Sequence, residues 1–157
     1  MRLALFQPDI PQNLGAAIRL SACLGAELDV IQPCAFSLDD RSAKRVALDY
    51  GPLASLSLHE NWEAFLAHPA RKEGRLVLFT TKSAQPFHDF AFQERDTLLF
   101  GRESAGAPEE VHAAAQARLL IPLTPAARSL NLVTACAIAL GEALRQTNGF
   151  PSAAQSG

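Results

Sequence analysis

The sequence predicts an α/β fold with a mostly parallel sheet and helices on both faces. Short apolar runs alternate with helical patterns along the chain, and there is no internal repeat. The strongest predicted strand is Arg75–Thr80, and the strongest predicted helix is Leu132–Arg145, which is rich in Ala and Leu. Strands that alternate with helices form β-α-β units, in which the strands pair in parallel.

Local signals define the elements of the first half. Leu3–Phe6 is predicted as a short buried strand. Asn13 is a suitable N-cap for a helix over Leu14–Leu24, and Gly25 is a suitable stop. A strand at Leu28–Ile31 follows, and then a helix that Asp39 or Asp40 caps and that runs through Leu48. The next elements are a weakly alternating edge strand at Ala54–Leu58 and a helix at Asn61–Ala67, which Pro69 ends.

The second half continues the alternation. After Arg75–Thr80 we predict a strand at Thr97–Phe100, a helix at Pro108–Ala115 with proline in its first turn, and a strand at Leu119–Leu123. A chain of 157 residues is long enough to bury a full core. We therefore predict a single domain over residues 1–147 and a flexible tail over residues 148–157.

Composition excludes several classes of protein. The chain is 48% hydrophobic and 19% charged, with a formal net charge of −2, so it has no general attraction for nucleic acid. No apolar run approaches the ~20 residues of a membrane span, and the N-terminal run is too short for a signal peptide. These features predict a cytoplasmic protein.

Cysteines and histidines give no sign of a metal site. The three cysteines have no CxxC spacing, which also suggests a reducing compartment. Cys23 and Cys136 fall in apolar helical patterns, where we expect them to act as small hydrophobic residues. The four histidines are scattered, and we expect them at the surface or half-buried: His59, His68, His88 and His112.

Glycine and polar residues gather where three strands end. Thr80–Lys82 and Gly101–Glu103 each follow a strand, and a third loop starts at Ile121 and closes at Ser129–Asn131. We expect the strands that end at Phe100 and Ile121 to lie beside each other, with ligand binding at their carboxyl edge. Gly101 would let a ligand approach the backbone.

Common nucleotide motifs are absent from these loops. There is no GxGxxG, and Ala107 stands where a phosphate-binding loop needs lysine, which argues against dinucleotide binding and NTP hydrolysis. What remains is a combination of segments: LFQPDIPQNLGAAIRLSACLG, DDRSAKRVALDY, FTTK, LLFGRESAGAPEEV and IPLTPAARSLNLVTACAIALGEALRQ. In this order the chain resembles the SPOUT superfamily of RNA methyltransferases and, within it, the TrmL group of tRNA 2′-O-methyltransferases. The resemblance extends over Leu3–Arg145.

The resemblance implies a fold, a cofactor and a substrate. The C-terminal part of the domain would form a deep trefoil knot, and the enzyme would be a homodimer with its active site at the subunit interface. The substrate would be the ribose 2′-hydroxyl of the wobble nucleotide, a cytidine or modified uridine, in tRNA anticodons. The cofactor would be S-adenosylmethionine, held mostly through backbone groups, and its family contacts fall on Phe79, Gly101, Ile121, Ser129 and Leu130.

The resemblance also suggests catalytic residues. The family assigns an important role to Arg19, and because a guanidinium almost never loses its proton, we expect Arg19 to hold phosphate and stabilise an alkoxide instead of acting as a base. Glu103 would complement the sulfonium or bind the partner subunit's Arg19. Asn131 would order the last loop and touch the ribose. The expected RNA contacts are Arg19, Lys44, Arg45, Arg102 and Arg128.

Two departures leave substrate detail open. Better-known TrmL members carry Arg where this chain has Ala105, and Tyr where it has Gly141. One alternative is therefore a SPOUT 2′-O-methyltransferase for another tRNA or rRNA position. The other is a non-catalytic RNA-binding dimer, against which the intact loops argue. A chain without an added RNA-binding domain favours a small anticodon stem-loop as substrate.

Overall fold

The computed structural model describes residues 1–38, 55–83 and 85–152. Lys44, Arg45 and the predicted helix that ends at Leu48 lie outside these residues. The strands are β1 (Arg2–Phe6), β2 (Glu27–Ile31), β3 (Ser55–His59), β4 (Leu76–Phe79), β5 (Thr97–Phe100) and β6 (Ala117–Leu119). The helices are α1 (Pro11–Leu24), α3 (Trp62–Ala67), α4 (Pro69–Lys72), the short 3₁₀ helix η1 (Phe87–Asp89), α5 (Glu109–Ala114) and α6 (Leu132–Thr147).

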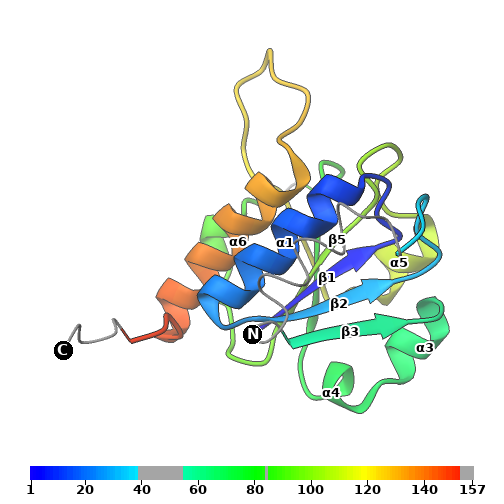
Figure 1. Ribbon diagram of the computed structural model, residues 1–157. Coiled ribbons are helices and arrows are strands. Elements are labelled where there is room, and N and C mark those ends of the chain that lie inside the picture. Colours follow the sequence, from blue (N-terminus) through cyan, green and yellow to red (C-terminus); the bar gives the residue numbers. More distant parts are fainter. Residues whose placement is uncertain (39–54, 84, 153–157) are drawn as a thin grey trace.

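The described strands form one six-stranded sheet in the order β3-β2-β1-β5-β4-β6. Every pair of neighbours is parallel. Figure 1 shows α1 and α6 side by side over one face of the sheet, whereas α3 and α5 pack on the opposite face. The predicted fold class, a mostly parallel sheet between two layers of helices, is confirmed.

Side chains alternate between two buried clusters, as a strand between two helical layers requires. On β1, Leu3 and Leu5 belong to the cluster under α1 and α6, while Ala4 and Phe6 belong to the cluster under α3 and α5. Within the first cluster Phe79 stacks on Phe100, with ring centroids 5.0 Å apart. These aromatic residues end β4 and β5 and so form a rigid base for the loops that follow.

The end of the sheet differs from the prediction in two ways. β6 covers Ala117–Leu119, not Leu119–Leu123, because Leu119 pairs with Phe79, the last residue of β4. Beyond that point Leu120 bridges to Pro86 instead. In addition, β4 lies between β5 and β6, so the strands that end at Phe100 and Leu119 share an edge of the sheet without being neighbours.

Helix α1 begins earlier than predicted. It starts at Pro11, whose fixed φ suits a first helical position, and Ile10 precedes it without a side-chain cap. Asn13 is buried within the helix, where its amide makes tertiary hydrogen bonds. The predicted stop is correct: Gly25 adopts the left-handed conformation, at φ 67°, and its N–H bonds to the carbonyl of Ser21.

Two histidines and one cysteine also depart from expectation. His59 and His112 are buried. His59 shares a short bond, 2.6 Å, with the Asp29 carboxylate, which also accepts from Arg2, so a buried polar network holds this ring in place. Cys23 is exposed although it lies in an apolar helical pattern. None of the helices in the described ranges has the length and apolar character needed to cross a membrane.

Candidate functional site

A cavity of about 550 Å³ opens at the carboxyl edge of the sheet. It is lined by the ends of β4 and β5, the start of α1, the loop over residues 101–107 and the loop over residues 121–131. β1 and β5 are neighbours, but the chain leaves β1 for α1 on one face and leaves β5 for α5 on the other. Such a switch in direction opens a crevice, which is where open α/β sheets bind ligands.

Glu103 ties three distant segments together at this cavity. Its Oε2 accepts from the backbone N–H of Asp9, at 2.8 Å, and its Oε1 accepts from Nδ2 of Asn13, at 3.1 Å. Asn13 in turn accepts through Oδ1 from Nδ2 of Asn131, at 3.0 Å. Both carboxylate oxygens therefore have donors within the same chain, and Glu103 links the 101–107 loop to Asp9 and to the start of α1.

Asn131 is the N-cap of α6. Its Oδ1 accepts from the N–H groups of Val133 and Thr134, at 2.9 and 3.2 Å. Nδ2 of the same side chain donates to Oδ1 of Asn13. An N-cap fixes the point at which a loop becomes a helix. Asn131 thus anchors the end of the 121–131 loop to the start of α1.

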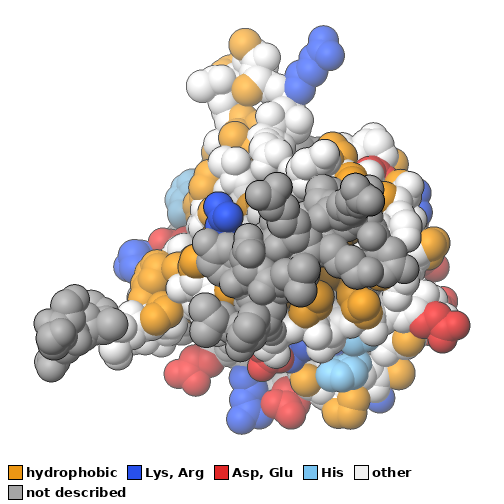
Figure 2. Space-filling view, in the orientation of Figure 1, with side chains coloured by type: hydrophobic (Ala, Val, Ile, Leu, Met, Phe, Trp, Pro, Cys, Tyr) orange, Lys and Arg blue, Asp and Glu red, His pale blue; other side chains and the backbone are white. Residues whose placement is uncertain are grey.

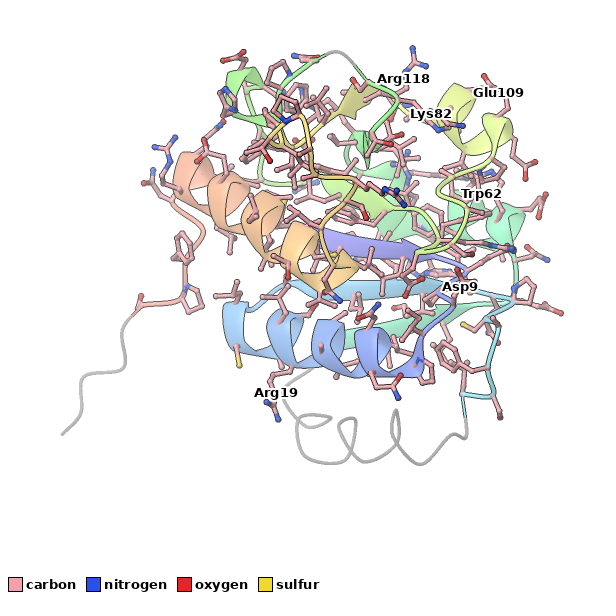
Figure 3. The ribbon with its side chains drawn as sticks, turned by 90° about the horizontal axis from the view of Figure 1, so that it is seen from above. Asp9, Arg19, Trp62, Lys82, Glu109 and Arg118 are labelled. Carbon is pink, nitrogen blue, oxygen red and sulfur yellow. The ribbon has the colours of Figure 1, made fainter. Side chains whose placement is uncertain are left out.

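Asp9 provides a second attachment for the 101–107 loop. Its Oδ2 accepts from the hydroxyl of Ser104, at 2.5 Å, and from the Ser104 backbone N–H, at 3.0 Å. The Ser104 hydroxyl bond is the main reason that the pKa of Asp9 lies below its ordinary value. Figure 3 shows Asp9 at the same edge of the molecule as the first turns of α1.

A third attachment joins Arg102 to Gln7, whose Oε1 accepts from the guanidinium. Gln7 adopts a left-handed conformation, at φ 46°, directly after β1. A residue other than glycine held in this region is strained, and such strain gathers at functional sites. The Arg102 Nε is buried without a hydrogen-bond partner among the described residues.

Gly101 is required by its own loop. A Cβ atom there would lie 2.4 Å from the backbone carbon of Gly106 and 2.5 Å from the Ala107 nitrogen. The loop folds back so closely because Arg102 and Gly106 exchange two backbone hydrogen bonds, and Gly106 takes a φ of 68°. The close approach of the loop to itself therefore requires glycine here, and the expected approach of a ligand to Gly101, which lines the cavity, stays a prediction.

The 121–131 loop is held much less firmly. Nearly all its residues from Pro122 to Asn131 are exposed. Within the described part of the chain, the one backbone hydrogen bond inside this loop joins the N–H of Ala127 to the carbonyl of Thr124. Figures 1 and 2 show the loop projecting from the body of the molecule, with hydrophobic side chains along it. Its backbone groups near the cavity are therefore available to a ligand.

The structure brings most of the predicted site residues to this one cavity: Phe79, Gly101, Arg102, Glu103, Ile121, Arg128, Ser129, Leu130 and Asn131. Arg19 is absent from its lining. Arg19 is an exposed residue of α1, and Figure 3 shows its side chain directed outward on the side of the molecule opposite to Lys82 and Arg118. Arg19 therefore does not reach the cavity of its own chain.

Sequence reasoning missed two polar side chains that line the cavity, Asn13 and His112. Asn13 was interpreted as a helix cap, although it lies in the polar QPDIPQN segment that could have marked it as part of a site. His112 gave no signal, since it sits in an ordinary helical pattern. Its ring is buried, and Nε2 has no hydrogen-bond partner in the described structure.

Among the residues that the structure describes, no three side chains of His, Cys, Asp or Glu come together in a way that could hold a metal ion.

Comparison with known proteins defines the class. The chain belongs to the SpoU rRNA methylase family, whose model matches residues 1–141. This match spans β1 to the middle of α6 and so includes every segment of the candidate site. The resemblance to the SPOUT superfamily is thereby confirmed.

Individual relatives are similar over nearly their full length. A tRNA (cytidine(34)-2′-O)-methyltransferase of Beijerinckia indica subsp. indica is 54% identical, over 94% of this chain and 92% of the relative. A solved structure described as giving insight into 2-OH methylation of C/U34 on tRNA is 43% identical, with a TM-score of 0.85, and covers 92% of this chain and 94% of its own.

A more distant structure carries a bound cofactor. The SpoU methyltransferase AviRb from Streptomyces viridochromogenes, in complex with AdoMet, is 26% identical to this chain, with a TM-score of 0.83. The match covers 93% of this chain and 60% of AviRb.

Proposed function

We propose that this chain is a cytoplasmic S-adenosylmethionine-dependent methyltransferase that methylates the ribose 2′-hydroxyl of nucleotide 34, the wobble position, in tRNA. The observation that carries the proposal is the 54% identity, over 94% of the chain, to a tRNA (cytidine(34)-2′-O)-methyltransferase. Cytidine 34 is accordingly the first expected acceptor. The similar C/U34 structure supports uridine as a second.

The cavity suits S-adenosylmethionine. Its volume of about 550 Å³ lies in the range of small-molecule sites. Phe79, Ile121 and Leu130 offer apolar surface for a purine, and the sparsely paired backbone from 121 to 130 offers donors and acceptors. When bound, this cofactor supplies an electrophilic methyl group. No role for a metal is proposed.

The transfer requires the chain to position the ribose, accept a proton and stabilise developing negative charge. Glu103 and Asn131 hold the two loops that bracket the cavity, through their bonds to Asn13. Arg19 is proposed to hold a phosphate and stabilise the alkoxide. Because Arg19 points away from its own cavity, this role assigns it to the cavity of a partner subunit.

A homodimer would place the partner subunit's Arg19 there and cover exposed apolar surface. Ile10, Leu130 and Ile138 are 41%, 36% and 38% exposed, on the start of α1, the projecting loop and α6. Large exposed apolar side chains on adjoining elements favour association. The knot expected from the family resemblance belongs to the same proposal, since the 121–131 loop and α6 would form it.

The test is methyl transfer to tRNA that lacks the modification, followed by mapping of methylated riboses. We expect one methyl group at nucleotide 34. The matched control is the same RNA synthesised with a 2′-O-methyl group already at nucleotide 34, which should accept none. Methylation at another position would identify a different RNA substrate. Binding of S-adenosylhomocysteine and RNA without transfer would instead favour a non-catalytic dimer.

A further inference from the structure

A second cavity, of about 660 Å³, lies beyond the edge strand β6. It is lined by the segment over Lys82, Ser83, Gln85 and Phe90 and by residues 115–118, which lead from α5 into β6. Lys82 lines this cavity and also the candidate cofactor cavity. The two cavities therefore meet at one lysine.

The charge of the second cavity is uniformly positive. Lys82 and Arg118 are both exposed, and Figure 3 shows them on the same side of the molecule. No carboxylate lines the cavity, and across the described residues neither cation forms an ion pair. In a chain of net charge −2, this local concentration of unpaired cations fits an anionic ligand.

The two cations are held on a fixed framework. The Ser83 hydroxyl donates to the backbone carbonyl of Arg118, at 2.5 Å, and the Leu120 N–H donates to the carbonyl of Gln85, at 2.9 Å. The Ser83 oxygen also accepts from the Gln85 N–H, at 3.2 Å. These bonds attach Ser83, which follows Lys82, and Gln85 to the strand end that carries Arg118, so the two cations lie on attached backbone.

We propose that Lys82 and Arg118 form a phosphate subsite for the RNA strand next to the methylated nucleotide. The inference rests on the proposed function, which places the reacting ribose at the first cavity. A strand whose ribose enters that cavity carries its neighbouring phosphates past the rim, and Lys82 stands on the rim that leads to Arg118. Lysine as a point charge and arginine as a planar fork both bind such phosphates, and neither contact reads the base sequence.

The experiment compares wild type with Arg118→Gln and Lys82→Gln, using a labelled anticodon stem-loop RNA with cytidine at the wobble position. The matched control is Lys72→Gln, which removes one exposed positive charge on α4. Each neutralised phosphate contributes about 0.7–0.9 to the slope of log affinity against log salt, so losing one contact weakens binding about four- to fivefold near 0.15 M salt.

We expect Arg118→Gln to lower RNA affinity by that factor and to reduce the salt slope by about 0.7–0.9, while Lys72→Gln changes neither. Arg118 lines only the second cavity, so its replacement should leave S-adenosylhomocysteine affinity unchanged in calorimetry. Thermal melting checks that each variant folds.

The possible failures are distinguishable. Wild-type affinity and slope in Arg118→Gln, with methyl transfer at nucleotide 34 intact in the wild type, would overturn the subsite and leave the function standing. A reduced slope in Arg118→Gln, with no transfer by the wild type, would overturn the function and keep the subsite. A wild-type protein that binds no RNA would overturn both.

Discussion

The two loops that line the candidate cofactor cavity are held in opposite ways. Side chains and backbone attach the 101–107 loop to the segment after β1, through Glu103, Ser104 and Arg102. The 121–131 loop projects, is exposed along most of its length, and is anchored chiefly at its end, where Asn131 caps α6. The wall formed by the 101–107 loop is thus held in place by the folded chain itself, whereas the wall formed by the 121–131 loop has few such contacts.

The less firmly held wall of the cavity, the 121–131 loop, is the one that depends on binding partners. Ordering a residue costs about 1–2 kcal/mol of backbone entropy, and folding has already met this cost for the 101–107 loop. For the 121–131 loop the remaining cost falls on binding, of cofactor, of RNA or of a partner subunit. We therefore expect the second loop to couple these three ligands.

The most severe test of this division removes Arg19, which the proposal assigns to a partner subunit's cavity. Arg19→Ala should leave fold, assembly and S-adenosylhomocysteine affinity intact but lower the methyl-transfer rate by ~10²-fold or more, the scale seen for one preorganised charge-stabilising donor. Arg19→Lys should recover little, because a point charge does not replace a planar fork. Arg95→Ala is the control, since it also removes an exposed arginine, one that pairs with Glu73 and does not line the cavity.

Mixed dimers locate Arg19 across the interface. Subunits with Arg19→Ala should regain activity when mixed with subunits carrying Ile121→Trp, which fills the cavity but keeps Arg19. Half of the sites in a heterodimer would then be whole. A wild-type rate for Arg19→Ala would refute the catalytic role, and demonstrably mixed dimers without rescue would refute its assignment to the partner.

Hydrogen exchange compares the two loops directly. Amides over residues 121–131 should exchange fast in the free protein. At an S-adenosylhomocysteine concentration of 100 times Kd, their exchange should slow by up to ~100-fold, because a ligand that binds only the closed loop can stabilise it by no more than this factor. The N–H groups of Arg102 and Gly106 should already be protected, because they are bonded to each other's carbonyls. Equal protection of both loops without ligand would show that the two loops are held equally firmly.

Replacing Glu103 should loosen the firm wall. Glu103→Ala leaves the Asp9 N–H and the Asn13 amide without their acceptor, and because both bonds are only part-buried we expect a loss of about 1 kcal/mol for each, at the lower end of the range for unpaired groups. For a chain of this size each kcal/mol lowers Tm by about 2–4 °C. The Tm of Glu103→Gln should lie between those of wild type and Glu103→Ala, since both partners are donors and an amide offers only one oxygen.

The control for Glu103 comes from the other loop. Ser129→Ala changes an exposed side chain, so its Tm should stay within the small range of ordinary surface substitutions. A larger loss of Tm in Ser129→Ala than in Glu103→Ala would show that the 121–131 loop, not the 101–107 loop, is the firmly held one.

The sequence predicted local features well and tertiary contacts poorly. Apolar runs identified β1, β4 and β5, since burial on both faces leaves a continuous signal. The ends of β6 and α1 were misplaced because they depend on neighbours: β6 stops where β4 stops, and Asn13 bonds to Glu103 instead of capping a helix.

The same limit applies to the site. Segment order identified the residues that line the cavity, but the bonds that hold them join positions 90 and 118 residues apart. No local pattern carries that information. For Gly101, the sequence predicts approach of a ligand, while its contact with Gly106 and Ala107 appears only in three dimensions.

The smallest expected effect is the pH dependence of the Asp9–Ser104 attachment. The folded protein lowers the pKa of Asp9 below its ordinary value of 3.8, chiefly because the ionised carboxylate accepts from the Ser104 hydroxyl. A group whose pKa is lowered on folding stabilises the protein above its unfolded pKa, and this contribution disappears as pH falls through the lower, folded value. The Tm difference between wild type and Asp9→Ala should therefore be constant near neutrality and shrink below pH 3.8.

This Tm difference should be small, because the Asp9 carboxylate is largely solvated and its interactions are screened. Ser104→Ala removes the hydroxyl but keeps the backbone donor, so it should reproduce part of the loss with the same pH profile. A Tm difference that grows on acidification would show that Asp9 is destabilising in its ionised form and that the attachment has the opposite sign.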